Sequence, residues 1–316
     1  MDPTNRTMRK AINSFYSFWL PLHSYKDDLV LYHYTSLDGL IGILQTKSLW
    51  CTDTSSLNDP MELKYGKKLV CDKLKEKINA NENNNIKKIL NDLINHVEGF
   101  DTILYRVFIA CFCDDDNLLS QWRAYAEKGV GYNIGFNFTT DTKFSHNPEY
   151  ISEDSYIILR KIIYDTNLQN EIITKSIDKI IEVAEMVEKY WTKQSSGLPV
   201  AWSSQAALET VNILFDIVMS FKNPVFEREQ EWRLIKVIDP DRLFNLLNFR
   251  NIYGRLTPYL KTIIYTNEKD KYFFPVSKIR FGPILDEKIT KKNLELYIKN
   301  ISNVISDGFV KSHKSL

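Results

Sequence analysis

The chain has 316 residues, 44% of them hydrophobic and 13% aromatic, which is enough to bury a large core. Its 41 basic and 40 acidic residues leave a net charge of +1, which disfavours a protein that coats nucleic acid through a basic surface. No apolar run approaches the roughly 18 residues that a membrane-spanning helix needs, and the N-terminus has no signal-peptide pattern. We expect a folded, cytoplasmic protein with no membrane contact.

The first third of the chain alternates short strands with amphipathic helices. Residues 1–25 are predicted to form a helical segment, and 29–34 form a strand rich in β-formers. Ser36 is a suitable N-cap for the next helix, in which apolar residues recur at helical spacing. A second strand is expected at 48–52, followed by two helices that the asparagine-rich stretch 81–85 separates.

The middle of the chain begins with the apolar run 105–113, which is typical of a buried strand. The aspartates 114–116 end it and are expected to cap a helix, on which Trp122 and Tyr125 share a face. Gly129 is a fitting end for that helix, and the next strands are expected at 131–138 and 156–164.

The last part of the chain predicts a pair of helices within about 166–222, which interrupts the strands as an insertion or a lid. Strands are then expected at 231–238, 262–265 and 278–281, and a final amphipathic helix follows Asp286. The pattern predicts a single α+β domain over 1–316, with a mixed or antiparallel sheet of roughly six to eight strands and flanking helices.

The cysteines and histidines do not have the spacing of a zinc site, and we predict no metal. Cys111 and Cys113 alternate within a strand-like run, so buried free thiols are expected, as in a reduced cytoplasmic protein. The chain also lacks a dinucleotide-binding glycine fingerprint, a Walker motif and a Gly-x-Ser-x-Gly motif.

The most informative stretch is Glu229-Gln230-Glu231-Trp232-Arg233, which enters a predicted strand. Because side chains alternate across a strand, Glu229, Glu231 and Arg233 are expected to point to one face. Neighbouring carboxylates lower stability unless cations or hydrogen-bond donors satisfy them. The segment is therefore either a surface ion cluster or a functional site, and the local sequence leaves both open.

Three further segments carry candidate chemistry, each beside a structural alternative. His33, at the end of the first strand, faces away from Tyr32 and Tyr34 and could donate to a ribose hydroxyl or a phosphate; the alternative is a satisfied core histidine. The second segment is a polar loop that either holds a ligand or caps a helix. The third carries aromatic side chains that either stack on a nucleobase or nicotinamide ring or belong to the protein core. The residues of these two segments are Asn58, Asp59 and Glu62 for the loop, and Gln121, Trp122 and Tyr125 for the aromatic segment.

Taken together, these segments resemble the bacterial domain of unknown function 2971 over about 30–285. The motifs that carry the resemblance are Tyr32-His33-Tyr34-Thr35, Leu49-Trp50, Leu57-Asn58-Asp59-Pro60-x-Glu62, Phe108-x-x-Cys111-Phe112, Gln121-Trp122-x-x-Tyr125-Ala126, Lys222-x-Pro224 and Glu229-x-Glu231-Trp232-Arg233.

The layout is also similar to that of ADP-ribosyltransferases, with a histidine on an early strand and a glutamate entering a late one. This resemblance implies that His33 contacts the nicotinamide-side ribose of NAD, that Glu231 is the catalytic carboxylate and that Glu229 helps the acceptor. Substrate-binding roles would then fall to Tyr34, Thr35, Asn58, Asp59, Glu62, Gln121, Trp122, Tyr125 and Arg233. The chain departs from the superfamily in having no clear Ser-Thr-Ser segment and no early phosphate-binding arginine.

The resemblance implies an NAD-using transferase or glycohydrolase, acting as a toxin or phage-defence effector on a protein or nucleic-acid acceptor. A partner protein of a defence or toxin–antitoxin system would accompany such an effector. A non-catalytic ligand-sensing or protein-interaction module is a second hypothesis, and a nucleic-acid-processing enzyme a third.

Overall fold

The computed structural model describes residues 28–57, 62–99, 106–145, 156–191, 205–238, 243–252, 254–268 and 271–301. The chain divides into two compact units that are built from alternating segments. We call them the helical unit, which contains 57–106 and 161–227, and the sheet unit, which contains 25–56, 107–160 and 228–316. The predicted N-terminal helix at 1–25 lies outside the described residues, and the single-domain organisation stays a prediction.

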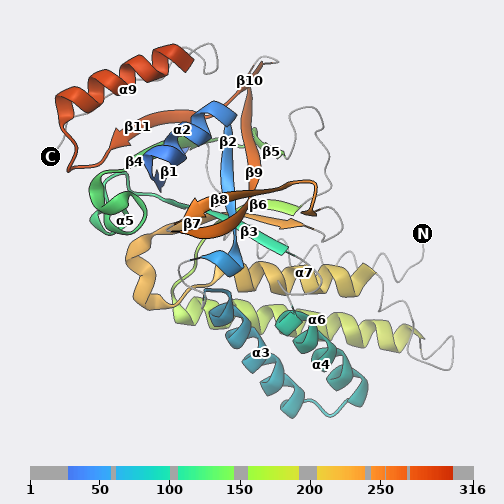
Figure 1. Ribbon diagram of the computed structural model, residues 1–316. Helices are drawn as coiled ribbons and strands as arrows, with labels where there is room; N and C mark the ends of the chain where they lie inside the picture. Colours follow the sequence, from blue (N-terminus) through green and yellow to red (C-terminus); the bar gives the residue numbers. More distant parts are fainter. Residues whose placement is uncertain are drawn as a thin grey trace. The chain divides into compact units, whose positions relative to one another are not determined.

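The sheet unit is organised around a curled antiparallel sheet, which confirms the predicted α+β class (Figure 1). Its main path runs in the order β10-β9-β2-β3-β1-β4-β11, and β5, β6, β7 and β8 pair with strands beside it. The bounds are β1 Leu29–Thr35, β2 Ser48–Asp53, β3 Arg106–Cys113, β4 Tyr132–Phe138, β5 Thr142–Ser145, β6 Tyr156–Lys161, β7 Glu231–Ile238, β8 Leu247–Ile252, β9 Arg255–Glu268, β10 Lys271–Phe273 and β11 Val276–Phe281.

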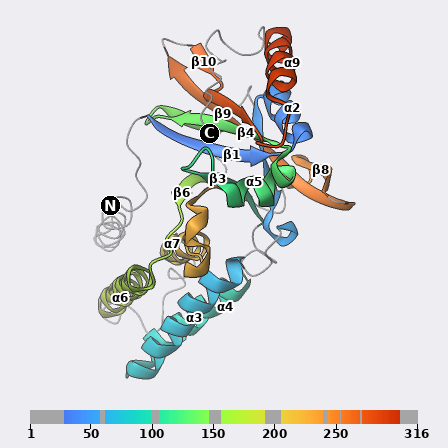
Figure 2. The same cartoon turned by 90° about the vertical axis from the view of Figure 1, so that its left-hand side faces the viewer.

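One face of the β1–β4 pair packs on helices α2 (Leu37–Thr46) and α9 (Glu287–Ile301), which lie near each other in both views (Figures 1 and 2). The Tyr297 hydroxyl donates a hydrogen bond to the Ile41 carbonyl, 3.4 Å away, and links the two helices. Ser36 caps α2 as predicted, because its Oγ accepts from the Gly39 amide at 3.0 Å. This face is the main apolar core, with members that include Leu31, Leu40, Ile43, Phe112, Ile134, Phe136, Phe138, Ile298 and Ile301.

The opposite face of β1 packs on helix α5 (Leu119–Tyr125). Strand alternation places Tyr32 and Tyr34 here, opposite Gly135 and Asn133 of β4 in the strand register. A Cβ at Gly135 would lie 3.0 Å from the Tyr32 ring, so glycine makes room for this aromatic ring. The sequence predicted that His33 faces away from both tyrosines, and this is confirmed.

The helical unit contains α3 (Glu62–Ala80), α4 (Asn84–Gly99), α6 (Thr166–Trp191) and α7 (Gln205–Ser220). The last two confirm the helices predicted within 166–222. Helices α3 and α7 approach closely, since a Cβ at Gly66 would lie 2.3 Å from the Val218 carbonyl oxygen. The Tyr65 hydroxyl also donates to the Gln169 Oε1 at 2.9 Å and joins α3 to α6.

Two expectations about the elements were wrong. The described residues form an 11-stranded sheet, because β5, β8 and β10 were not predicted. These strands are short or mix polar and apolar residues, and each of them pairs with β9 alone. The aspartates 114–116 do not cap α5 either, since its N-cap is Leu118, which makes no side-chain capping hydrogen bond.

Candidate functional site

His33 lies on β1, and its ring packs edge-on against Phe112 with the ring centroids 5.8 Å apart. Its Nδ1 lies 2.8 Å from the backbone oxygen of Cys111. A carbonyl oxygen only accepts hydrogen bonds, so Nδ1 carries the proton. Burial, offset in part by this hydrogen bond and assisted by the charge of Arg250, lowers the pKa of His33 to about 4.

His33 is therefore neutral at pH 7, with its lone pair on Nε2. This tautomer accepts a hydrogen bond at Nε2, for example from a sugar hydroxyl, but does not donate one there. The sequence-based idea that His33 donates to a ribose or a phosphate is thus corrected by its environment. The backbone bond to Cys111 also fits the structural alternative of a satisfied core histidine.

Glu231 and Arg233 form a buried ion pair on β7. Arg233 Nε donates to Glu231 Oε1 at 2.7 Å, and Arg233 Nη2 donates to Glu231 Oε2 at 3.1 Å. The residues are two apart on one strand, so they share a face, as predicted. Glu231 is only 4% exposed and Arg233 is fully buried, and this two-point contact holds the carboxylate ionised and oriented.

Glu229 is not part of strand β7, so the prediction that it shares a strand face with Glu231 and Arg233 was wrong. It ends the 3₁₀-helix η4 (Pro224–Glu229), and β7 begins only at Glu231. Between them Gln230 has a φ of 47°, in the left-handed region, and this breaks the strand alternation on which the prediction depended. Glu229 still lies close enough to Cys113 for its charge to raise the pKa of that thiol, after burial as the main cause.

Strand β3 joins the segments that carry the candidate residues. It pairs with β1, which bears His33, with Tyr32 opposite Cys113 in the register. It also pairs with β2, where Thr52 lies opposite Ile109, and with β7, which bears Glu231. Three motifs that are far apart in the sequence therefore lie on strands that neighbour one strand.

Lys236 is a buried cation on β7 that the sequence analysis did not single out. Its Nζ lies 3.2 Å from the Lys261 carbonyl and 3.4 Å from the Thr262 hydroxyl, and the residue is 1% exposed. Burial lowers the pKa of Lys236 to about 8, with a smaller opposing effect from Cys51. An apolar strand such as Leu234–Ile238 gives no signal that its one lysine points inward.

A second cation, Arg250 on β8, lies against two aromatic rings. Its guanidinium carbon is 5.5 Å from the ring centroids of both Trp50 and Tyr259, which stack on each other at 4.8 Å. Its Nη2 donates to Thr52 Oγ1 at 2.6 Å. This residue was missed because β8 was not predicted as a strand.

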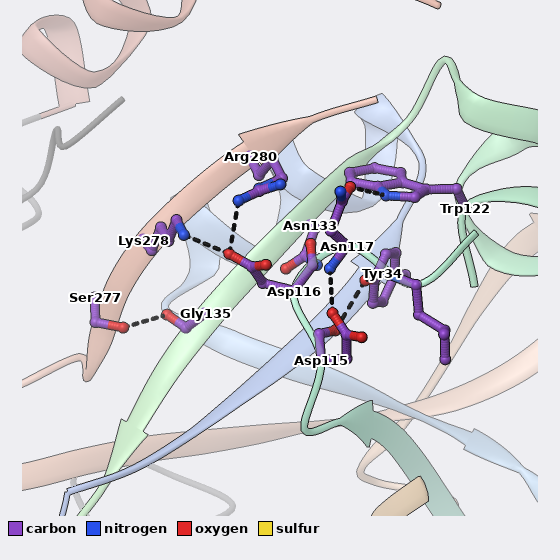
Figure 3. Close-up of polar contacts among 11 residues, drawn as sticks. Tyr34, Asp115, Asp116, Asn117, Trp122, Asn133, Gly135, Ser277, Lys278 and Arg280 are labelled. Atoms are coloured by element: carbon purple, nitrogen blue, oxygen red, sulfur yellow. Dashed lines mark hydrogen bonds and ion pairs between the residues drawn. The ribbon is translucent and has the colours of Figure 1, made fainter. Parts of the chain in front are cut away.

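Tyr34 anchors the loop between β3 and α5 (Figure 3). Its hydroxyl donates to the Asp115 backbone oxygen and accepts from the Leu118 amide, each at 2.9 Å. The Trp122 ring meets Tyr34 edge-on with centroids 4.9 Å apart, and Trp122 Nε1 donates to Asn117 Oδ1 at 3.1 Å. Burial raises the pKa of the Tyr34 phenol, so it stays protonated.

The same loop is held from β4 and β11 by polar contacts to Asp116 (Figure 3). The Asp116 carboxylate accepts from Lys278 Nζ and, at 2.9 Å, from Arg280 Nη2. Its backbone oxygen accepts from Asn133 Nδ2 at 3.0 Å, while Asn133 Oδ1 is buried without a hydrogen-bond partner. The aspartates that were expected to cap a helix instead fix the loop to the sheet.

The remaining predicted residues are placed as follows. Trp122 is 2% exposed and packs with Tyr34, so its ring contributes to the core of this face; Gln121 is also buried, whereas Tyr125 is 39% exposed. Thr35 is buried beside Gly39, where a Cβ would lie 2.0 Å from the Thr35 Oγ1.

The predicted polar loop is only partly described. Asn58 and Asp59 lie outside the described residues. Glu62 begins α3, which belongs to the helical unit. The ligand-binding roles of all three residues stay predictions.

No group of three or more His, Cys, Asp or Glu side chains within the described ranges is arranged to hold a metal ion. In the part of the chain that the structure describes, every helix is too short or too polar to cross a membrane. The four cysteines are free, with Cys111 half-buried and the others buried.

One family model matches part of the chain. The family model described as protein of unknown function (DUF2971) matches residues 121–234. The matched segment begins within α5 at Gln121 and Trp122 and ends within β7, after Glu231 and Arg233. No curated protein and no solved structure matches the chain. From α5 to β7, the chain therefore resembles the DUF2971 family.

Proposed function

We propose that this protein cleaves the nicotinamide–ribose bond of NAD, as an ADP-ribosyltransferase or an NAD glycohydrolase. The observation that carries the proposal is that β1, with His33, and β7, with Glu231, both pair with β3. Both candidate residues thus lie on strands that are next to β3, and this connectivity agrees with a shared ligand. The layout similarity noted from the sequence supplies the reaction.

In this reaction the bond from the ribose carbon to the nicotinamide nitrogen breaks, and nicotinamide leaves with the electron pair. Positive charge develops on the ribose, where a fixed carboxylate lowers the transition-state energy. Glu231 has this role, held ionised and oriented by Arg233. His33 Nε2 accepts a hydrogen bond from a ribose hydroxyl, in keeping with its neutral tautomer. Water or an acceptor nucleophile then bonds to the ribose carbon and loses its proton.

Glu229 is the candidate for receiving that proton, because it lies next to the β7 entry but outside the strand. The acceptor is a protein or nucleic-acid group in the cytoplasm, as for a toxin or a phage-defence effector with a regulatory partner protein. Cleavage by water alone would deplete NAD without an acceptor.

The test is nicotinamide release from NAD by the purified full chain, beside Glu231→Gln. We expect release by the wild type and a loss of about 100-fold or more in the variant, because an electrostatic partner of the transition state is removed. The Gln side chain keeps one oxygen acceptor for Arg233 but lacks the negative charge. Circular dichroism and a thermal melt therefore check that the variant is folded.

A second candidate function, a non-catalytic ligand-sensing module, is favoured by one observation. Glu231 is 4% exposed and contacts Arg233 through both carboxylate oxygens, which is also the geometry of a structural ion pair. Under this reading Glu231→Gln lowers the melting temperature, and neither protein releases nicotinamide, with or without cell lysate as a source of acceptor. That result would exclude the enzymatic proposal.

A further inference from the structure

Arg250 has polar atoms that the protein leaves unused. Its Nη2 donates to Thr52, but its Nε is buried without a hydrogen-bond partner. No described carboxylate lies within ion-pair distance of the guanidinium. The titratable groups near it include Tyr259 and Cys51, whose pKa values are raised by burial, so both are uncharged at pH 7. Burial lowers the pKa of Arg250 as the main effect, which reflects a cation removed from water without a counter-ion.

An unpaired guanidinium of this kind lowers the stability of the fold, so its surroundings indicate what it is held for. Trp50 and Tyr259 stack beneath it, and the hydrogen bond to Thr52 fixes one of its terminal nitrogens. The planar fork is thus pre-oriented, while the residue as a whole retains part of its exposure. Its Nε is buried, so the donors left for the oxygens of a phosphate or carboxylate are Nη1 and the second N–H of Nη2.

The neighbouring charges also favour an anion. The charges of Arg250 and Lys236 both reach the buried Cys51 thiol, and that of Arg250 reaches the His33 ring. Asp53, which follows Thr52 on β2, already accepts hydrogen bonds from the Ser55 amide and hydroxyl, at 2.9 and 2.5 Å. The strands β1, β2, β7 and β8 carry three cations (Arg233, Lys236 and Arg250) and two carboxylates (Asp53 and Glu231), and Glu231 is already paired with Arg233.

We propose that Arg250 is an anion-binding residue that takes the diphosphate group of a nucleotide ligand, with Trp50, Tyr259 and Thr52 holding its guanidinium in position. In naming a dinucleotide such as NAD as the source of that diphosphate, the inference rests on the proposed function. The anion site itself depends only on the geometry around Arg250. It supplies a phosphate-binding arginine from β8, where the sequence showed none near the first strand.

The experiment measures binding of inorganic pyrophosphate and of ADP-ribose to the purified full chain by isothermal titration calorimetry. We expect Arg250→Gln to weaken both by at least about tenfold, because charge-assisted hydrogen bonds are lost. Arg250→Lys should bind more weakly than wild type, since an ammonium lacks the fork. Arg250→Gln removes an unpaired charge together with the hydrogen bond to Thr52 and the contact with two rings, so a thermal melt of each variant checks that it is folded.

Arg255 provides a matched control, because it is an exposed arginine on the adjacent strand of the same hairpin. Arg255→Gln removes the same charge and should leave binding within about twofold of wild type. Equal weakening by the two variants would reduce the effect to general charge and overturn the proposal. Absence of wild-type binding to both probes would overturn it as well.

Pyrophosphate binding and nicotinamide release, measured on the same preparations, separate this inference from the proposed function. Arg250-dependent pyrophosphate binding without nicotinamide release would retain the anion site and reject the NAD reaction. Nicotinamide release that Arg250→Gln leaves unaffected would retain the NAD reaction and reject the anion site.

Discussion

At the scale of single residues, the environment of a side chain decides its chemistry. His33 was singled out by its position at the end of a strand, and that position is correct. Its charge and tautomer follow instead from the Cys111 carbonyl and from burial against Phe112, which belong to a strand far away in the sequence. The same holds for Lys236, whose partners lie on β9.

We expect His33 to make stability depend on pH. Its folded pKa of about 4 is below the ordinary value of 6.5, so between these values the unfolded chain binds a proton that the folded chain does not. The free energy of unfolding therefore falls as the pH is lowered through this window, and it is fully retained above it. The full contribution is about 3 kcal/mol, because each unit of pKa difference corresponds to about 1.4 kcal/mol.

His33→Asn tests this, because its amide nitrogen can replace the Nδ1 donor without titrating. Urea unfolding from pH 7 to pH 4.5 should show a shallower loss for this variant than for wild type. His96→Gln, at an exposed position on α4, is the control and should follow the wild-type curve. Parallel curves for His33→Asn and wild type would show that His33 is not held neutral.

At the scale of elements, the start of β7 and the loop after β3 show how local rules are overridden. Two glutamates separated by one residue suggested a shared strand face, but the backbone of Gln230 is in the left-handed region and β7 starts only at Glu231. Three consecutive aspartates suggested a helix cap, but Asp116 instead pairs with β11. At β7 the backbone conformation of Gln230 ended the alternation, whereas Asp116 found cationic partners on a strand that is distant in the sequence.

Asp116 is predicted to fix its loop to the sheet. Asp116→Asn removes the counter-ion of two partly buried cations, Lys278 and Arg280, so unfolding should require about 1–2 kcal/mol less free energy. The measurement is urea denaturation at pH 7. Asp72→Asn breaks an exposed pair with Lys68 and should change stability by less than about 0.5 kcal/mol. If both variants lose the same amount, the contact is only a surface pair.

At the scale of the whole molecule, the chain passes repeatedly between two compact units. The sequence predicted one domain with a helical insertion at about 166–222. The helical unit also includes α3 and α4, which come from much earlier in the chain. Contacts between helices so far apart are set by packing, which a helical pattern in a single segment does not encode.

Gly66→Ala addresses the cooperativity of these units. Its added Cβ would lie 2.3 Å from the Val218 carbonyl oxygen, so α3 and α7 must separate, at about 1–3 kcal/mol. Hydrogen exchange followed by mass spectrometry should show faster exchange in α3, α4, α6 and α7, with β1 and β4 unchanged. Equal acceleration in both units would instead favour the single domain. Gly99→Ala adds a Cβ with nothing within 4 Å and is the control.

The sequence by itself determined the α+β class, most strands and helices, and the polar residues worth testing. These depend on periodicity and on local capping, which short segments encode directly. Only the tertiary structure decided that β1, β2 and β7 meet at β3, and that Arg250 lies against Trp50 and Tyr259. Such contacts depend on strand order and on burial, and both arise from pairings between residues that are distant in the chain.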